Sequence, residues 1–138
     1  MHSKPTTVLI IDDEPGHARL ALRRMSKDID LAPQVFTTGR KALEFLHEMP
    51  ANERHNLVIL LDLNMPGMDG YQVLQRIKMN DDVRFIPVIV LSSTDNQDEI
   101  LRCYMAGANL YLVKQMDYEE YKKTLDFVVD FIHMFRRI

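Results

Sequence analysis

Side chains that can bind a cation or a phosphoryl group follow four of the short apolar runs in this sequence. Aspartates come directly after the first and third runs, a serine closes the fourth, and a lysine follows the fifth. If these runs are parallel strands of one sheet, their carboxyl ends lie at the same edge and the side chains meet there. The residues concerned are Asp12, Asp13, Asp62, Asn64, Ser92 and Lys114.

The chemistry that this set could perform is the transfer of a phosphoryl group to a carboxylate. Three carboxylates in one crevice repel one another unless a cation offsets their charge, and such oxygen ligands suit Mg²⁺. Lys114 would add a positive charge and Ser92 a hydroxyl donor for a phosphoryl group. An aspartate can itself be the covalent acceptor. Taken without the rest of the set, Asp12 and Asp13 would be a turn and a helix cap.

Short apolar runs alternate with amphipathic stretches along the chain, which is typical of repeated strand–helix units. The run at 57–61 is apolar at every position, the pattern of a strand buried on both faces of a parallel sheet. Strands are predicted over 7–11, 57–61, 87–91 and 110–113, with a weaker one near 34–36. Helices are predicted from Pro15 onward, over 40–48, 70–80 and 96–106, and from Asp117 to about Arg137, with a surface loop over 49–56.

Helix ends carry recognisable signals. Asp69 is predicted to cap the amino end of the third helix, and Gly107 to follow the carboxyl end of the fourth. Asp117, with Glu120 three residues later, predicts a capping box at the start of the last helix.

This order of elements predicts one α/β domain over residues 1–138. The expected architecture is a doubly wound (βα)5, flavodoxin-like three-layer sandwich with a five-stranded parallel sheet. Right-handed crossovers would place helices on both faces of that sheet. In such folds the ligand site lies beyond the carboxyl ends of the strands, where the candidate residues fall.

Composition excludes several classes of protein. The chain has 138 residues, of which 46% are hydrophobic and 27% charged, as in ordinary globular domains. A net charge of −3 disfavours a nucleic-acid-binding role. The single cysteine, Cys103, excludes an intrachain disulfide and a cysteine-based zinc site. No signal peptide or membrane span is evident, so a cytoplasmic protein with no membrane partner is expected.

The strings VLIIDDE, LVILLDLNMPGMDGYQVL, IPVIVLSST and GANLYLVK resemble the receiver domain of two-component response regulators. The resemblance runs from about Val8 to the last helix, and the four motifs stand in the family's order. It implies that Asp62 is the phosphoacceptor and that Asp12 and Asp13 are the acid pair. Asp13, Asp62 and the main-chain carbonyl of Asn64 would bind Mg²⁺ directly, with Asp12 acting mainly through water.

The resemblance also implies how a phosphoryl group would be contacted and sensed. Ser92 matches the serine/threonine switch position, Tyr111 the rotating aromatic residue and Lys114 the phosphate-contacting lysine. One departure concerns the loop after Lys114, because receivers usually have proline next and this chain has Gln115. A cis bond before a non-proline residue costs about 2.5–4 kcal/mol, so we expect the Lys114–Gln115 bond to be trans.

Within receivers, the string YMAGANLYLVK and the aromatic-rich last helix resemble the stand-alone regulators paired with bacterial phytochrome kinases. The implied function is a single-domain response regulator that accepts a phosphoryl group from a sensor histidine kinase and signals through a changed protein-contact surface. Two alternatives stay open, a receiver fragment of a longer regulator and a phosphorelay intermediate. An enzyme is disfavoured, because acids rather than a phosphate-binding loop follow the first strand and the Asp-x-Asp of aspartate-nucleophile phosphatases is missing.

The last helix carries two apolar stripes at helical spacing. One is predicted to face the sheet and consists of Tyr121, Leu125, Val128, Ile132 and Phe135. The second lies about 100° round the helix and consists of Phe127, Phe131, Met134 and Ile138. It could cover a neighbouring helix, but we expect Phe127, Phe131 and Met134 to form the face of a homodimer.

Other polar and reactive residues are given simpler roles. The five histidines show no metal-ligand spacing and are expected to be solvated. Arg23-Arg24 and Arg136-Arg137 are too sparse for a nucleic-acid patch and are expected on solvated faces. Cys103 is expected to be an inert, buried thiol. In the first helix, Ala18, Leu22 and Met25 are predicted to form the buried face.

Overall fold

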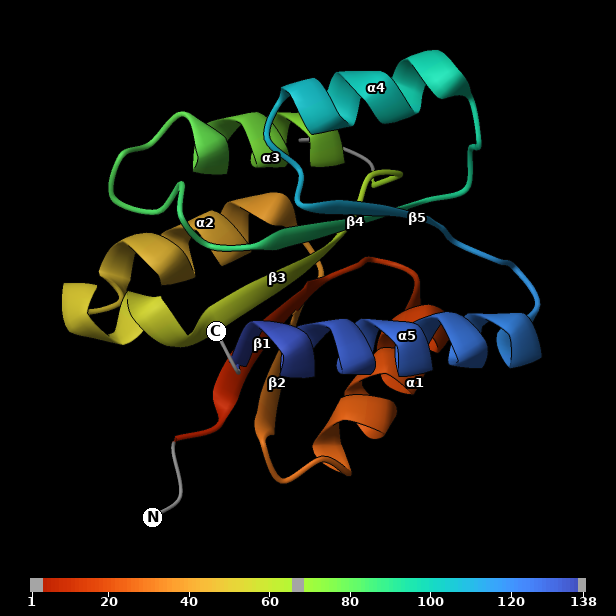
Figure 1. The fold of residues 1–138 in the computed structure, drawn as a ribbon, viewed down its shortest axis with the longest axis horizontal. Coiled ribbons are helices and arrows are strands. Elements are labelled where there is room, and N and C mark those ends of the chain that lie inside the picture. Colours follow the sequence, from red (N-terminus) through yellow and green to blue (C-terminus); the bar gives the residue numbers. More distant parts are fainter. Residues whose placement is uncertain (1–3, 66–68, 137–138) are drawn as a thin grey trace.

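A computed structural model describes residues 4–65 and 69–136 of the chain. These residues contain one parallel five-stranded sheet in the order β2-β1-β3-β4-β5 (Figure 1). Its strands are β1 (Thr6–Ile11), β2 (Leu31–Phe36), β3 (Leu57–Asp62), β4 (Val88–Ser92) and β5 (Leu110–Val113). The predicted fold class is confirmed.

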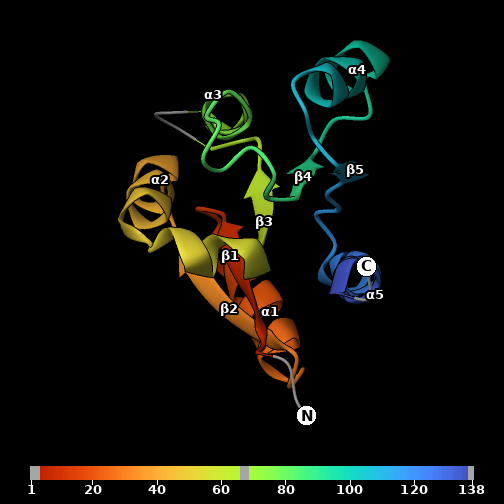
Figure 2. The same ribbon diagram turned by 60° about the vertical axis from the view of Figure 1, so that its left-hand side comes forward.

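Helices cover both faces of the sheet, which gives the three predicted layers (Figures 1 and 2). The helices are α1 (Pro15–Ser26), α2 (Gly39–Glu48), α3 (Gly70–Lys78), α4 (Gln97–Met105) and α5 (Tyr118–Arg136). One core cluster joins the sheet to α1 and α5, and the other joins it to α2, α3 and α4. The sheet therefore separates two groups of helices, and side chains that alternate along each strand serve one core or the other.

The interior strands β3 and β4 contribute side chains to both cores. Every residue of β3 and β4 is buried, as expected for strands covered on both faces. β1 and β3 pair in parallel with Ile11 opposite Leu61, so the residues that follow them leave the sheet at the same level. This register brings the first and third apolar runs into the alignment that the candidate site requires.

The edge strand β2 is longer than the predicted 34–36. It begins at Leu31 and pairs with β1 through Pro33, which lies opposite Val8. Proline suggests a break in a central strand, but an edge strand tolerates the missing N–H. The pairing with β1, which the local sequence does not reveal, thus extends the strand by three residues relative to the prediction.

The surface loop predicted over 49–56 is wrong in part, because Ala51–Asn56 forms a 3₁₀ helix, η1. Arg54 donates to the carbonyls of Leu46 and His47 at 3.2 and 3.1 Å, near the carboxyl end of α2. The Asn56 side chain donates to the Pro5 carbonyl at 2.8 Å. These side chains satisfy main-chain acceptors of other segments, and the connection is ordered for that reason.

Most of the helix-end predictions are confirmed. The Asp69 carboxylate accepts from the Gln72 N–H at 2.8 Å, and Gly107, with φ +107°, follows the end of α4. The capping box of α5 is wrong. Asp117 Oδ1 accepts from the N–H of Glu119 at 3.2 Å, and the Glu120 carboxylate binds Lys123 Nζ at 3.1 Å instead of turning back to the helix start.

The buried faces of α1 and α5 differ in detail from the prediction. Ala18 and Met25 are buried as predicted, but Leu22 is exposed. The fully buried face of α1 instead includes Ala21 and His17, so the expectation that every histidine is solvated is wrong. His17 could have been found from the sequence, because it lies one turn before Ala21 on the same stripe.

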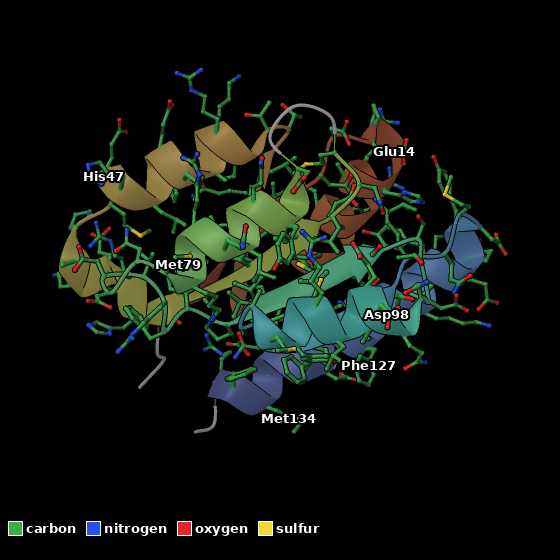
Figure 3. The ribbon with its side chains drawn as sticks, turned by 90° about the horizontal axis from the view of Figure 1, so that it is seen from above. Glu14, His47, Met79, Asp98, Phe127 and Met134 are labelled. Carbon is green, nitrogen blue, oxygen red and sulfur yellow. The ribbon has the colours of Figure 1, made fainter. Side chains whose placement is uncertain are left out.

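On α5 the inner stripe is buried from Tyr121 to Ile132, but Phe135 is only partly buried. In the second stripe Phe127 and Met134, both labelled in Figure 3, are 52% and 63% exposed. Phe131 is partly buried and packs against the α1–α5 core. Ile138 lies outside the described residues. The alternative that this stripe covers a neighbouring helix is not supported for α4, which packs on the other face of the sheet (Figure 2).

No helix among residues 4–65 and 69–136 combines the length and the apolar character needed to cross a membrane. Cys103 is buried on α4, as predicted, and burial raises the pKa of its thiol. The Lys114–Gln115 peptide bond is trans, which confirms that prediction.

Gly70 provides a test of how tightly β3 and α3 approach each other. Its N–H donates to the Leu63 carbonyl at 3.2 Å, and a Cβ at this position would lie 2.5 Å from the Asp62 carbonyl oxygen. A glycine-to-alanine change in a helix normally stabilises it. We predict that Gly70→Ala instead destabilises the protein, because main-chain atoms occupy the space that the methyl group needs. The expected loss in the free energy of unfolding is on the order of 1–3 kcal/mol. Urea unfolding measures this, and an unchanged or raised stability contradicts it.

Candidate functional site

The carboxyl edge of the sheet holds a buried cluster of two carboxylates and one ammonium group. Asp12 follows β1, Asp62 ends β3 and Lys114 follows β5, and all three are buried. Lys114 Nζ lies 2.7 Å from Asp12 Oδ2 and 3.3 Å from Asp62 Oδ2. Residues that are far apart in the sequence therefore meet as their positions at the strand ends predicted.

Asp13 completes an acidic group beside Lys114. Single carboxylate oxygens of Asp12, Asp13 and Asp62 lie within 4.8 Å of one another. Three carboxylates against one ammonium leave negative charge uncompensated, and Asp13 is the partly exposed member of the group. The donor set consists of hard oxygens and fits Mg²⁺.

The main chain orients the two buried carboxylates. Asp12 Oδ1 accepts from the Glu14 N–H at 2.9 Å, and Asp62 Oδ1 accepts from the Asn64 N–H at 3.0 Å. In each case Oδ1 binds the local main chain and Oδ2 faces Lys114. Burial raises the pKa of Asp12 to about 6, although the hydrogen bond from Lys114 opposes this change. A bound cation would favour the ionised form in the same way as Lys114.

The predicted switch residues lie on the α4 side of this cluster. Ser92 is buried at the end of β4, and its hydroxyl lies 3.4 Å from Asn64 Oδ1 and accepts from the Thr94 N–H at 3.3 Å. The Tyr111 side chain is also buried, and its hydroxyl donates to the Thr94 carbonyl at 2.8 Å. The Ser92–Asp95 turn thus connects the phosphoryl side of the site with the aromatic ring on β5.

The Asn64 side chain makes contacts that the sequence did not predict. Its side-chain oxygen accepts from the main-chain N–H of Ser93 at 3.1 Å and is near both serine hydroxyls. The side chain therefore ties the β3–α3 loop to the end of β4. The metal-binding role expected for its main-chain carbonyl stays a prediction.

Two aromatic residues and a histidine behind Lys114 were not predicted to belong to the site. The Tyr121 ring centroid lies 5.8 Å from Lys114 Nζ, and His17 contacts the Tyr121 and Tyr118 rings at centroid distances of 4.5 and 5.4 Å. Burial and the charge of Lys114 lower the pKa of His17. The sequence marks Tyr121 as a core residue, but only the packing of α1 on α5 places it beside the lysine.

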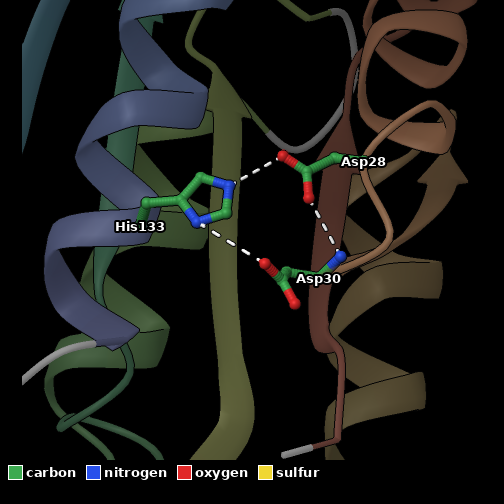
Figure 4. A group of neighbouring side chains, drawn as sticks. All are labelled: Asp28, Asp30 and His133. Carbon is green, nitrogen blue, oxygen red and sulfur yellow. Dashed lines mark hydrogen bonds and ion pairs between the residues drawn. The ribbon is translucent and has the colours of Figure 1, made fainter. Parts of the chain in front are cut away.

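A second group of metal-ligating side chains, Asp28, Asp30 and His133, joins the α1–β2 turn to the end of α5 (Figure 4). His133 Nε2 lies 2.7 Å from Asp28 Oδ2, and Nδ1 lies 3.9 Å from Asp30 Oδ2. The two nitrogens face different carboxylates, so the imidazole bridges them. Arg136 lies 3.5 Å from Asp30 and already offsets its charge. We therefore assign this group to structural attachment of α5.

The arginines near this group also connect elements instead of lying on solvated faces, which corrects the prediction for Arg24 and Arg136. Arg24 on α1 binds Asp126 on α5 at 2.6 Å. Arg136 donates to the Thr6 hydroxyl at 2.6 Å. Neither contact was visible in the sequence, because each joins residues more than a hundred positions apart.

Comparison with known proteins identifies the family. Residues 8–126 match the response regulator receiver domain. The response regulator Rcp1 of Synechocystis is 34% identical over 131 residues, covering 92% of this chain and 88% of Rcp1. A probable methanogenesis regulatory protein of Methanothrix harundinacea, FilR2, is 31% identical over 131 residues, covering 92% of this chain and 83% of the relative.

Solved structures agree with this result. The Mn²⁺-bound form of Rcp1 superposes with a TM-score of 0.79 at 30% identity, covering 90% of this chain and 91% of that one. The phosphorylated cyanobacterial phytochrome response regulator RcpA gives a TM-score of 0.82 at 25% identity, covering 92% and 93%. The resemblance to receivers noted in the sequence is confirmed.

The His133 bridge predicts a pH-dependent contribution to stability. Burial raises the pKa of Asp28, but the hydrogen bonds with His133 and the Asp30 N–H outweigh this and hold the pKa below 3.8. A lowered carboxyl pKa stabilises the fold above pH 3.8, and this stabilisation is lost as the pH falls through the lowered value. We predict that His133→Ala costs on the order of 1 kcal/mol near neutral pH and less in acid.

Urea unfolding at several pH values measures this difference. His47→Ala is the control, because the His47 side chain is exposed on α2. An equal loss of stability in both variants, or a loss for His133→Ala that grows below pH 3.8, contradicts the assignment.

Proposed function

This chain belongs to the response regulator receiver domain family, whose members are phosphoacceptors in two-component signalling, and we propose that its acceptor is Asp62. The observation that carries the proposal is the position of this carboxylate. Asp62 ends the fully buried strand β3, its Oδ1 is fixed by the Asn64 N–H, and its Oδ2 faces Lys114. One oxygen is therefore oriented by the main chain and the other lies beside a cation.

The donor would be the phosphohistidine of a sensor histidine kinase. An Asp62 carboxylate oxygen attacks phosphorus, the new O–P bond forms as the N–P bond breaks, and the electron pair stays on the histidine nitrogen. The product is an aspartyl-phosphate. Lys114 Nζ, now shared by Asp12 and Asp62, would contact a phosphoryl oxygen, and Ser92 would supply a hydroxyl donor.

Mg²⁺ is the proposed cofactor. Asp13, Asp62 and the main-chain carbonyl of Asn64 would hold it directly and Asp12 mainly through water, and the donor oxygens of the three aspartates lie within 4.8 Å of one another. When bound, the ion offsets negative charge on the phosphoryl group. The Mn²⁺-bound form of the relative Rcp1 supports a divalent ion here.

Phosphorylation would act on protein contacts rather than on a substrate. Ser92 and Tyr111 both bind Thr94, so a Ser92 hydroxyl drawn to a phosphoryl oxygen would change the turn that holds the Tyr111 ring. The surface thus altered lies over α4 and β5. The likeness to the phytochrome response regulator RcpA supports a kinase of the phytochrome type, acting in the cytoplasm.

Asp62→Asn is predicted to abolish Mg²⁺-dependent labelling by a small phosphodonor, measured as the mass increase of the intact protein. Asparagine keeps the size of the side chain but lacks the nucleophilic carboxylate. Asp98→Asn, an exposed position on α4, is the control and should be labelled like the original chain. Full labelling of Asp62→Asn would show that another residue is the acceptor.

We also propose that two copies of the chain associate through α5. Phe127 and Met134 expose large apolar areas on one side of the helix, and a two-fold axis would pair this side with itself. Phe131 lies between them but is partly buried against the chain's own core. Its substitution by aspartate would therefore disturb the fold as well as the dimer.

Phe127→Asp is the cleaner test of this surface. It is predicted to shift the mass in sedimentation from dimer toward monomer, while Asp62 still accepts phosphate. Leu101→Asp on α4, where the leucine is 59% exposed, is the matched control and should leave the mass unchanged. An original chain that sediments as a monomer at high concentration, phosphorylated or not, removes the dimer proposal.

A further inference from the structure

The loop that carries Lys114 has few contacts of its own. Gln115, Met116 and Asp117 are all exposed, and no proline follows the lysine to restrict the chain. Lys114 itself is buried, with its ammonium at hydrogen-bond distance from two carboxylates. The contacts that hold the loop in place must come from the start of α5 and from α1, on which α5 packs.

Tyr118, the first residue of α5, provides one such contact. A Cβ placed on Gly16 would overlap the Tyr118 hydroxyl, so this side chain lies directly on the first turn of α1. The same ring meets His17 edge-on at 5.4 Å. The start of α5 is therefore held against the residues that follow the acid pair.

His17 and Tyr121 provide the second contact. His17 is 1% exposed, and its ring lies 4.5 Å from that of Tyr121, which is fully buried. His17 Nδ1 lies 2.9 Å from Glu14 Oε2, so the ring is tied to the residue that caps α1. The Tyr121 hydroxyl makes no hydrogen bond within the described residues. The Tyr121 ring centroid also lies 5.8 Å from Lys114 Nζ. A buried tyrosine hydroxyl without a partner is costly, which points to a purpose other than stability.

We propose that Gly16, His17, Tyr118 and Tyr121 are positioning residues that direct the Lys114 ammonium group toward Asp62. Gly16 leaves room for the Tyr118 ring, this ring fixes the start of α5, and Tyr121 with His17 behind it limits the space open to the lysine. These residues act through Lys114 and do not touch the reacting atoms. The inference rests on the proposed function, because the group to be contacted is the phosphoryl group on Asp62.

The test is a double-mutant cycle between Gly16→Ala and Lys114→Ala. The methyl group displaces Tyr118, so Gly16→Ala should slow Mg²⁺-dependent labelling by a small phosphodonor on the order of tenfold, since small displacements of a reacting group are costly. In the Lys114→Ala background the same change should have less than about a twofold effect, because its target is gone. The Mg²⁺ affinity of Gly16→Ala, measured by calorimetry, should match that of the original chain, because this variant keeps Lys114 and all three carboxylates.

Matched variants separate positioning from general damage. Tyr118→Phe keeps the ring on His17 and should retain most of the labelling rate, whereas Tyr118→Ala should reproduce the Gly16→Ala defect. Tyr71→Ala removes a partly buried tyrosine on α3, whose ring contacts Arg102, and should leave the rate unchanged. An unchanged rate in Gly16→Ala, or an equal loss with and without Lys114, overturns the proposal.

A second measurement does not depend on phosphorylation. Acylation of lysines by an amine reagent, mapped by mass spectrometry, reports how freely each ammonium is reached. Gly16→Ala should speed the acylation of buried Lys114 several-fold and leave that of exposed Lys41 unchanged. If the original chain is never labelled on Asp62, the proposed function fails. The acylation rate still decides whether Gly16 and the aromatic residues beside it position the lysine. Unchanged Lys114 acylation rejects the positioning role.

Discussion

The repulsion between three carboxylates at one edge of the sheet is the constraint on which the rest of the structure depends. Asp12 and Asp62 are buried, and a buried charge without a partner is strongly unfavourable. Lys114 offsets only part of this charge, and it comes from a different strand. The fold must therefore hold the ends of β1, β3 and β5 in fixed relative positions while leaving room for a cation.

This constraint explains which parts of the fold and site could be predicted from the sequence. The β3 and β4 runs are apolar throughout, and residues that follow parallel strands must share an edge of the sheet. The meeting of Asp12, Asp62 and Lys114 follows from those two facts without knowledge of any side-chain contact. The motifs of the receiver family add residue roles, such as that of Ser92, which periodicity alone does not supply.

What could not be predicted depends on contacts between distant segments. η1 is ordered by Arg54 and Asn56 acting on main-chain groups elsewhere, and β2 is extended by pairing with β1. His133 binds a turn more than a hundred residues away. Local patterns describe a residue's preference for a helix or a strand, but not its partner across the molecule. His17 is the exception, since its place on a buried stripe was readable.

The sheet also divides the site into two sides with different tasks. Tyr111 belongs to the core beneath α3 and α4, where its hydroxyl and Ser92 both bind Thr94. Tyr121 belongs to the core beneath α1 and α5, beside His17 and behind Lys114. Lys114 links the two sides, because its N–H donates to the Ser92 carbonyl at 2.7 Å and its ammonium lies 5.8 Å from the Tyr121 ring centroid. Since packed cores resist continuous deformation, a change on the α4 side can leave the lysine in place as long as the α1–α5 side holds it. A proline after the lysine would restrict the main chain of the loop. Because this chain has Gln115 there, the loop depends more on such packing.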